Sequence, residues 1–241
     1  MGLNLENLKK YLIFKVKCIY LYAKIDMVYN FSEHSSIIST YMAEIRDVSI
    51  QKDPMRFRLN MERIAEIMGY EISKKMKYVS KEVTTPLGVA VEQVLEEQPV
   101  LITILRAGLA MHQGLVRTFD RAESAFVSAY RKHTTPEDFE IFVEYLAAPS
   151  LDNRIWVISD PMLASGNSMV AVLNALKSQG NPKRIVIASA IATPEAIRLV
   201  QQHTPSNTEI WVGAIDKELT AQSYIVPGLG DAGDLAFGVK V

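Results

Sequence analysis

The sequence predicts an α/β fold in which helices flank a twisted, parallel β-sheet. Two observations support this fold class. Short apolar runs rich in β-branched residues recur along the second half of the chain, as in strands that are buried on both faces of a sheet. Segments with helical spacing of apolar residues separate several of these runs. Because strand and helix alternate, we expect right-handed crossovers, which make the strands parallel.

The individual elements follow from the same patterns. Residues 58–76 predict a long helix, because apolar side chains recur there at helical spacing and give one buried face. A second stripe, from Met169 to Leu176, predicts a helix that ends near Gly180. Thr193 followed by Pro194 is typical of an N-cap and a first helical turn. The expected strands are residues 100–105, 124–130, 154–159, 184–192 and 209–215.

Composition excludes several classes of protein. The chain has 241 residues with 49% hydrophobic content, enough for one well-packed core. Its formal net charge of −1 does not indicate nucleic-acid binding, which needs a basic excess or a concentrated basic patch. The single cysteine, Cys18, excludes a disulfide framework within the chain and argues against a cysteine-based zinc site. This cysteine usage favours a cytoplasmic location.

The N-terminal segment is apolar but does not predict a membrane span. Residues 11–25 are interrupted by Lys15, Lys17 and Lys24, and a lysine near the centre of a span costs about 2.5–3.5 kcal/mol. A signal peptide would need an uninterrupted apolar run. We expect residues 1–30 to be an extension outside the domain, either poorly ordered or translated from an upstream start, with Met27 as the alternative first residue.

A loop after the strand at 154–159 has the features of a phosphate site. Asp160 leads into a stretch with Gly166 and two serines, and a helix is expected from about Ser168. Free N–H groups at a helix start attract anions, and an aspartate beside them suits ribose hydroxyls. No lysine is present, so this is not the loop of a triphosphate-hydrolysing enzyme. The alternative is an ordinary turn with a serine N-cap.

Two arginines follow other predicted strands. Arg106 comes directly after residues 100–105, and Arg131 follows residues 124–130. Guanidinium groups suit phosphate or pyrophosphate. The alternatives are pairing of Arg106 with a nearby acid and a solvated loop at Arg131. Since ligands bind at the carboxyl ends of parallel strands, we expect both arginines to lie near Asp160.

Other catalytic constellations are missing from the sequence. The four histidines do not have metal-ligand spacing, and neither H-E-x-x-H nor G-x-S-x-G occurs. We therefore expect no metal held by protein ligands alone and no protein nucleophile. The G-x-G-x-x-G match at Gly228–Gly233 is not a dinucleotide fingerprint, because only eight residues follow it and no βαβ unit can form.

Three motifs identify a family. ILRAGLAMHQGL from Ile104, ISDPMLASGNS from Ile158 and YIVPGLGDAGDLAFG from Tyr224 resemble, in order and spacing, the uracil phosphoribosyltransferases among the type I phosphoribosyltransferases. The resemblance runs from about Phe31 to the end. It implies a Rossmann-like sheet with a small hood of terminal segments, so that residues 31–241 form one domain in which residues 216–241 contribute the base-binding hood.

The resemblance also implies an activity. These enzymes convert uracil and 5-phosphoribosyl 1-pyrophosphate to UMP and pyrophosphate, a step of pyrimidine salvage. Both substrates are small molecules, Mg²⁺ enters with the donor, and the family implies a homodimer or larger homo-oligomer. Displacement at the anomeric carbon passes through an oxocarbenium-like state, so catalysis comes from positioning and from stabilising the leaving pyrophosphate.

Carried over to this sequence, the family motifs assign roles to single residues. Arg106 and Arg131 should hold the pyrophosphate, and together with Asp231, beside the ribosyl donor, they are the predicted catalytic residues. The donor should also contact Asp160 through its ribose hydroxyls, and Ala164–Ser168 through its 5′-phosphate. The predicted donor-binding loop is Asp160, Pro161, Met162, Leu163, Ala164, Ser165, Gly166, Asn167 and Ser168. The predicted uracil-binding residues, acting largely through backbone groups, are Ile225, Gly230, Asp231 and Ala232.

Two departures from the family pattern leave alternatives open. Asn167 stands where the family's phosphate loop usually has glycine; asparagine tolerates positive φ, but its side chain could change donor affinity. Leu235 and Ala236 replace a charged and a bulky residue, which bears on tail packing. A non-catalytic regulator that senses nucleotide or donor is the alternative function. A transferase for another base is disfavoured by the C-terminal motif.

Overall fold

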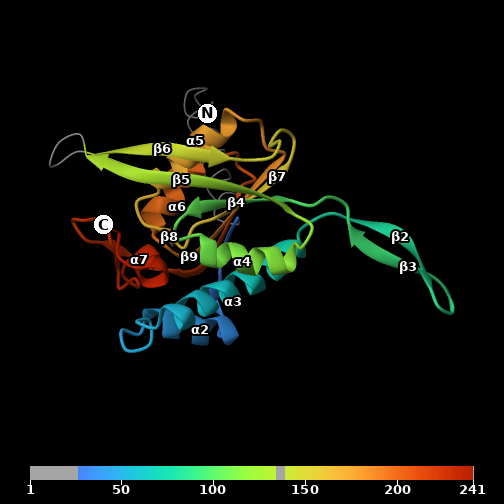
Figure 1. The fold of residues 1–241 in the computed structure, drawn as a ribbon, viewed down its shortest axis with the longest axis horizontal. Helices are drawn as coiled ribbons and strands as arrows, with labels where there is room; N and C mark the ends of the chain where they lie inside the picture. The colour runs from blue at the N-terminus through green and yellow to red at the C-terminus, as the bar shows by residue number, and fades with distance from the viewer. Residues whose placement is uncertain (1–26, 134–138, 241) are drawn as a thin grey trace, which may run out of the picture.

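The computed structural model describes residues 27–133 and 139–240, and its centre is a mostly parallel sheet (Figure 1). Every strand pair along the sheet is parallel except the last, in which β6 runs antiparallel to β5. A short strand, β8 (Met162–Leu163), pairs with β9. The predicted fold class is therefore confirmed. The order across the sheet is β1 (Val28–Asn30), β10 (Glu209–Ile215), β9 (Arg184–Ala192), β7 (Ile155–Ser159), β4 (Val100–Leu105), β5 (Glu123–His133) and β6 (Phe139–Ala147).

The strand predictions are close to the observed bounds. β4, β9 and β10 have the predicted limits, and β7 begins one residue later than expected. The exception is β5, which begins one residue earlier than expected and continues to His133, because β6 pairs along it. Arg131 therefore lies in a strand and not in the solvated loop that the sequence left open as an alternative. The sequence analysis missed β6.

Helices cover both faces of the sheet. On one face lie α2 (Ile37–Arg46), α3 (Pro54–Ser73) and α4 (Leu109–Thr118), and on the other lie α5 (Asn167–Lys177) and α6 (Pro194–His203). Each face of the sheet has its own hydrophobic core, and successive residues of a strand point to opposite faces. Leu101 packs in the core with α2, α3 and α4, and Ile102 packs in the core with α5 and α6. This two-sided burial explains why the strands are apolar throughout.

The start of α6 confirms the capping prediction, whereas α3 begins and ends a few residues before the predicted helix of residues 58–76. Thr193 is the N-cap of α6, and its hydroxyl accepts the N–H of Ala196 at 3.0 Å. Pro54 begins α3 after Asp53, whose carboxylate accepts two backbone N–H groups. α4 packs closely on α3, since a Cβ at Gly114 would lie 2.0 Å from the Glu62 carbonyl oxygen.

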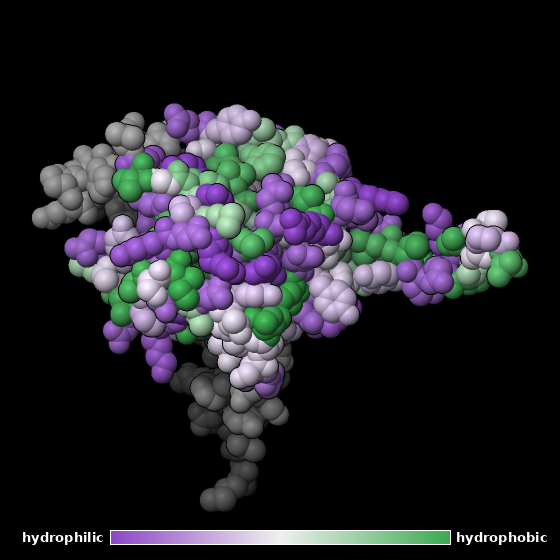
Figure 2. All heavy atoms as spheres, turned by 60° about the horizontal axis from the view of Figure 1, so that its bottom comes forward, coloured by the Kyte–Doolittle hydropathy of each residue, from purple (hydrophilic) through white to green (hydrophobic). Residues whose placement is uncertain are grey.

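A β-hairpin projects away from the sheet (Figure 1). It consists of β2 (Tyr78–Thr85) and β3 (Gly88–Leu95), which pair in antiparallel register. Several of its apolar side chains are exposed, among them Leu87, Val89 and Val91. Figure 2 shows hydrophobic residues along this arm, interspersed with hydrophilic ones. The hairpin was not predicted.

The remaining elements lie near the two ends of the described chain. They are the 3-10 helix η1 (Phe31–Glu33), the strands β11 (Glu218–Leu219) and β12 (Ile225–Val226), and the helix α7 (Ala232–Phe237). β1 falls within the predicted extension, and there Tyr29 stacks on Trp211 of β10 with ring centroids 4.0 Å apart. In residues 27–133 and 139–240, no helix is long and apolar enough to cross a membrane.

Candidate active site

Two adjoining cavities open at the carboxyl ends of the central strands. The first, of about 330 Å³, includes the loop after β7, and the second, of about 350 Å³, includes the start of the loop after β4. Four residues line both cavities: Asp160, Met162, Ser168 and Asp231. The predicted convergence of strand-end residues is thus confirmed for Asp160 and Arg106, which line the second cavity together.

The loop of the first cavity is shaped by Gly166. This residue is the N-cap of α5, with φ at +84°, and it makes no side-chain cap hydrogen bond. A Cβ there would lie 3.1 Å from the Ala196 backbone of the neighbouring helix. Thr193 fixes the other side of the loop by donating its hydroxyl to the Ala164 carbonyl at 2.7 Å. Because the N-cap is a glycine, it offers no side-chain acceptor to the N–H groups that follow it. The N–H of Asn167, the first residue of α5, donates instead to Ser165 Oγ at 3.4 Å.

Most of the predicted donor-binding loop faces the cavity. Asp160 to Ser168 line it except at two positions: Pro161, which is buried, and Asn167, which is exposed. Ser165 and Ser168 both line the cavity with their hydroxyl-bearing side chains available as donors. The loop thus combines a helix start with two hydroxyls, the chemistry that suits a phosphate group.

Asp160 is the titratable group most altered by its surroundings. Withdrawal from water raises the pKa of its carboxyl to about 7, and the hydrogen bond from the Met162 N–H, at 3.3 Å, opposes that rise. A carboxyl group with a strongly shifted pKa in a concave site is a common feature of functional sites.

Arg106 enters the second cavity beside an acid. Its Nη2 lies 3.1 Å from Asp234 Oδ1, and its Nη1 donates to the Gly238 carbonyl at 3.3 Å. The pairing with a nearby acid, which the sequence left open as an alternative, is therefore present. The peptide bond between Leu105 and Arg106 is cis.

Arg131 lies within β5, where its backbone pairs with Ile141 of β6. Its side chain falls outside the part of the chain whose side chains the structure describes. Its predicted contact with pyrophosphate stays a prediction.

Of the predicted uracil-binding residues in the C-terminal motif, only some line a cavity. Asp231 is exposed, lines both cavities and caps α7 by accepting the Asp234 N–H at 3.0 Å. Ala232 lines the second cavity, whereas Ile225 and Gly230 line neither. Ile225 belongs to the short strand β12, and Gly230 has φ at +91°.

Comparisons with known proteins identify the family of this chain. Residues 32–239 match the profile of the uracil phosphoribosyltransferase family. The chain belongs to this family. Its relatives include a uracil phosphoribosyltransferase of Porphyromonas gingivalis, 51% identical over 87% of this chain and 97% of the relative. One of Thermococcus gammatolerans is 37% identical over 90% and 95% of the two chains. A solved structure from Aquifex aeolicus superposes with a TM-score of 0.79 at 29% identity, covering 89% of this chain and all of the other.

This chain departs from the pattern of the uracil phosphoribosyltransferase family at Asn167 and at Leu235–Ala236, and the structure shows where these residues lie. The expected positive φ at Asn167 is wrong: Gly166 adopts it, and Asn167 is the first helical residue. Its side chain is exposed and lines neither cavity. In the tail, α7 stays packed, since Ala236 is buried and its carbonyl accepts Arg58 Nη1 at 2.6 Å.

Sequence reasoning missed two acids near this uracil phosphoribosyltransferase site. Asp234 lines the second cavity and engages Arg106. It lies in the same motif as Asp231, so the motif itself carried the signal. Asp216 directly follows β10, as Asp160 follows β7. The rule that selected Asp160, an acid after a buried strand, also selects Asp216.

Proposed function

We propose that this protein transfers the 5-phosphoribosyl group of 5-phosphoribosyl 1-pyrophosphate to uracil, releasing UMP and pyrophosphate. The observation that carries the proposal is the shared border of the two cavities. One cavity has the loop at the start of α5, the other has Arg106, and Asp160, Ser168 and Asp231 line both. A ligand with a phosphate at one end and a pyrophosphate at the other matches this arrangement.

The donor is proposed to span both cavities. Its 5′-phosphate lies against Ala164–Ser168, where N–H groups and hydroxyls donate to phosphate oxygens. Asp160, at the border of the two cavities, accepts hydrogen bonds from the ribose hydroxyls. Arg106 and Arg131 hold the pyrophosphate, where a guanidinium stabilises charge that grows as the leaving group departs.

The base is proposed to bind at the C-terminal motif. Backbone groups of Ile225 and Gly230 to Ala232 meet the oxygen and N–H edge of uracil, and Asp231 lies beside the anomeric carbon. The bond from that carbon to the pyrophosphate oxygen breaks, the bond to the uracil nitrogen forms, and the nitrogen loses its proton to water. Cytosine would leave buried polar groups mispaired, which can give discrimination of about 10⁴ or more.

Mg²⁺ is part of the proposal as a partner of the donor. Among the described residues, no group of three or more His, Cys, Asp or Glu side chains could hold a metal. A cation carried by phosphate oxygens needs few protein ligands, since protein sites often give Mg²⁺ only one or two carboxylates. Asp160 and Asp231 are the carboxylates at the cavity border. When bound, Mg²⁺ neutralises charge on the pyrophosphate.

We further propose a homodimer in a cytoplasmic setting. The projecting hairpin supports the dimer, because β2 and β3 expose several apolar side chains that a second copy could cover. The single cysteine of the chain supports the location.

One assay tests the function. Purified protein is mixed with uracil, donor and Mg²⁺, and UMP is followed, with cytosine and hypoxanthine as alternative bases. We expect UMP from uracil only, and loss of turnover when Mg²⁺ is chelated. Donor binding without UMP formation would instead support a sensing regulator, and turnover of another base alone would support a different transferase.

A further inference from the structure

A partly buried ion pair lies behind the C-terminal motif, outside both cavities. Arg46 is the last residue of α2, and Asp216 directly follows β10. Their side chains are 23% and 8% exposed, and they meet in a two-pronged contact: Nη1 lies 2.7 Å from Oδ2, and Nη2 lies 3.0 Å from Oδ1. Such paired contacts fix the relative orientation of both groups.

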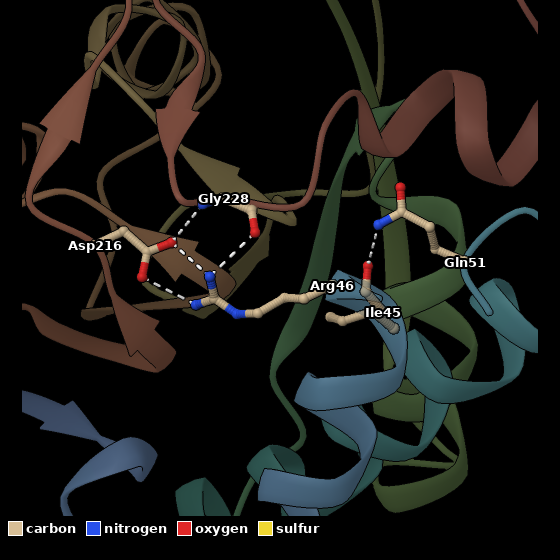
Figure 3. Close-up of polar contacts among 5 residues, drawn as sticks. All are labelled: Ile45, Arg46, Gln51, Asp216 and Gly228. Carbon is tan, nitrogen blue, oxygen red and sulfur yellow. Dashed lines mark hydrogen bonds and ion pairs between the residues drawn. The ribbon is translucent and has the colours of Figure 1, made fainter. Parts of the chain in front are cut away.

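The pair also holds one residue of the base-binding motif from both sides. Asp216 Oδ2 accepts the N–H of Gly228 at 2.9 Å, and Arg46 Nη1 donates to the Gly228 carbonyl at 3.0 Å (Figure 3). Gly228 itself has φ at +61°, and a Cβ there would lie 2.1 Å from the Ile225 carbonyl oxygen. The sharp bend at Gly228 therefore depends on glycine and is tied to two side chains, of which that of Arg46 is remote in sequence.

The Arg46–Asp216 pair and its two contacts to Gly228 form a clamp, and the end of α2 that carries Arg46 is itself held in place. Gln51, which is buried, donates its Nε2 to the Ile45 carbonyl at 3.0 Å and so satisfies the end of α2 next to Arg46 (Figure 3). The bend at Gly228 lies in the chain between Ile225 and Gly230, two of the residues that are proposed to bind uracil. Between β12, which ends at Val226, and α7, which begins at Ala232, no regular element supports the backbone.

Energetics argue against a purely stabilising role for this pair. Removing two charges from water costs free energy that the attraction between them often only offsets, and apolar replacements are frequently as stable. A role in holding the backbone in position accounts for the arrangement better. Two of the four contacts fix Arg46 and Asp216 relative to each other, and the other two fix the Gly228 backbone to them.

We propose that Arg46 and Asp216 are positioning residues for the base. They hold Gly228 so that the backbone groups of Ile225 and of Gly230 to Ala232 face uracil, without touching substrate themselves. This inference rests on the proposed function.

The same strand offers a matched control at its opposite end. Arg184 forms an ion pair with Glu209, the first residue of β10, and their side chains are 19% and 8% exposed. Each member also has a further partner: Arg184 donates to the Lys75 carbonyl, and Glu209 accepts the Trp211 Nε1. The two pairs thus match in burial and in the further partner that each member has, although Arg184 and Glu209 meet through one contact and Arg46 and Asp216 through two. They differ in whether they hold the base-binding motif.

Steady-state kinetics on the full chain test the inference. Asp216→Asn is expected to raise the KM for uracil about tenfold or more and to leave the KM for the donor within about twofold. Glu209→Gln should leave both unchanged while lowering Tm by a similar amount. Arg46→Lys keeps the charge but loses the planar fork, so it should show the same uracil-specific defect. Equal effects of the two pairs on uracil KM, or none from either, would overturn the proposal.

Hydrogen exchange separates failure of the clamp from failure of the proposed function. In the absence of substrates, Asp216→Asn should lose protection in residues 225–232, and Glu209→Gln should not. If wild-type protein makes no UMP, the proposed function fails, and this readout alone decides whether the clamp exists. Unchanged protection in Asp216→Asn would contradict it.

Discussion

Arg106 and Asp234 form an ion pair in the cavity proposed for pyrophosphate, with Nη2 3.1 Å from Oδ1. Both side chains are substantially exposed, at 41% and 34%, so the pair contributes at most about 1 kcal/mol to stability. The consequence for binding is larger, because a donor phosphate must compete with the Asp234 carboxylate for the same guanidinium.

The first prediction follows from that competition. Asp234→Asn should lower the KM for the donor severalfold, since the variant removes the competing charge, and should leave Tm nearly unchanged. Arg106→Gln is the matched change on the other partner and should raise the donor KM. A higher donor KM in Asp234→Asn would show that the carboxylate assists binding instead.

Asp231 combines a structural and a proposed catalytic role, and substitution can separate them. Asparagine caps helices about as well as aspartate, so Asp231→Asn should keep the α7 cap and the wild-type Tm. Its kcat should fall about a hundredfold, because the carboxylate beside the donor is lost. Asp231→Ala should lose the cap as well, at about 1 kcal/mol. Wild-type turnover in the asparagine variant would refute the catalytic role.

Asp160 makes stability depend on pH. Its pKa rises from 3.8 to about 7 on folding, so between these values the folded state binds more protons than the unfolded state. Stability therefore falls as pH rises through this window, by at most about 4 kcal/mol at 1.36 kcal/mol per pKa unit. This loss of stability, which comes from ionising the buried Asp160 carboxyl, is absent below about pH 4 and complete above about pH 7.

Urea unfolding at several pH values checks this sign. Asp160→Asn should be more stable than wild type at pH 8, with the difference vanishing near pH 4. Asp120→Asn, at an exposed position, is the control for the loss of one surface charge. A constant difference between Asp160→Asn and wild type across the range would contradict the burial effect.

The phosphate loop predicts a contrast between neighbouring residues. Ser168 lines both cavities, so Ser168→Ala should weaken donor binding about 10- to 100-fold through loss of a hydrogen bond to a charged group, worth about 1.5–3 kcal/mol. Asn167 is exposed and lines neither cavity, so Asn167→Ala should bind donor normally. Titration calorimetry with the donor measures both. Equal affinities in the two variants would argue against the proposed phosphate cradle.

The hairpin predicts a change in assembly. Replacing Val89 and Val91 together by lysine should convert the proposed dimer to a monomer, because both side chains are exposed on one face of β3. Val48→Lys, also at an exposed apolar position, should leave assembly unchanged. Sedimentation velocity distinguishes the two states, and a monomeric wild-type protein would refute the proposal.

The sequence by itself determined the five central strands of the sheet, the strand-end positions of the functional loops and the family. Buried parallel strands are continuously apolar, so β4, β9 and β10 could be delimited residue by residue. The glycine- and serine-rich loop after β7 carried its own signal as well. By contrast, the hairpin escaped prediction because most of its side chains are exposed, so that no buried face marks its two strands. Strand β6 was also missed, although its Val143 and Leu146 pack against the second core.

Only the tertiary structure decided which residues meet. Arg106 and Asp234 lie far apart in the chain, as do Arg46 and Asp216, and a local pattern contains no information on such contacts. The clamp on Gly228 exists because the end of α2, the end of β10 and the C-terminal bend reach the same point. The position of the left-handed residue at Gly166, one before Asn167, was likewise decided by how closely the loop approaches Ala196 on α6. Local composition predicts elements, whereas the packing of those elements against one another brings the site together.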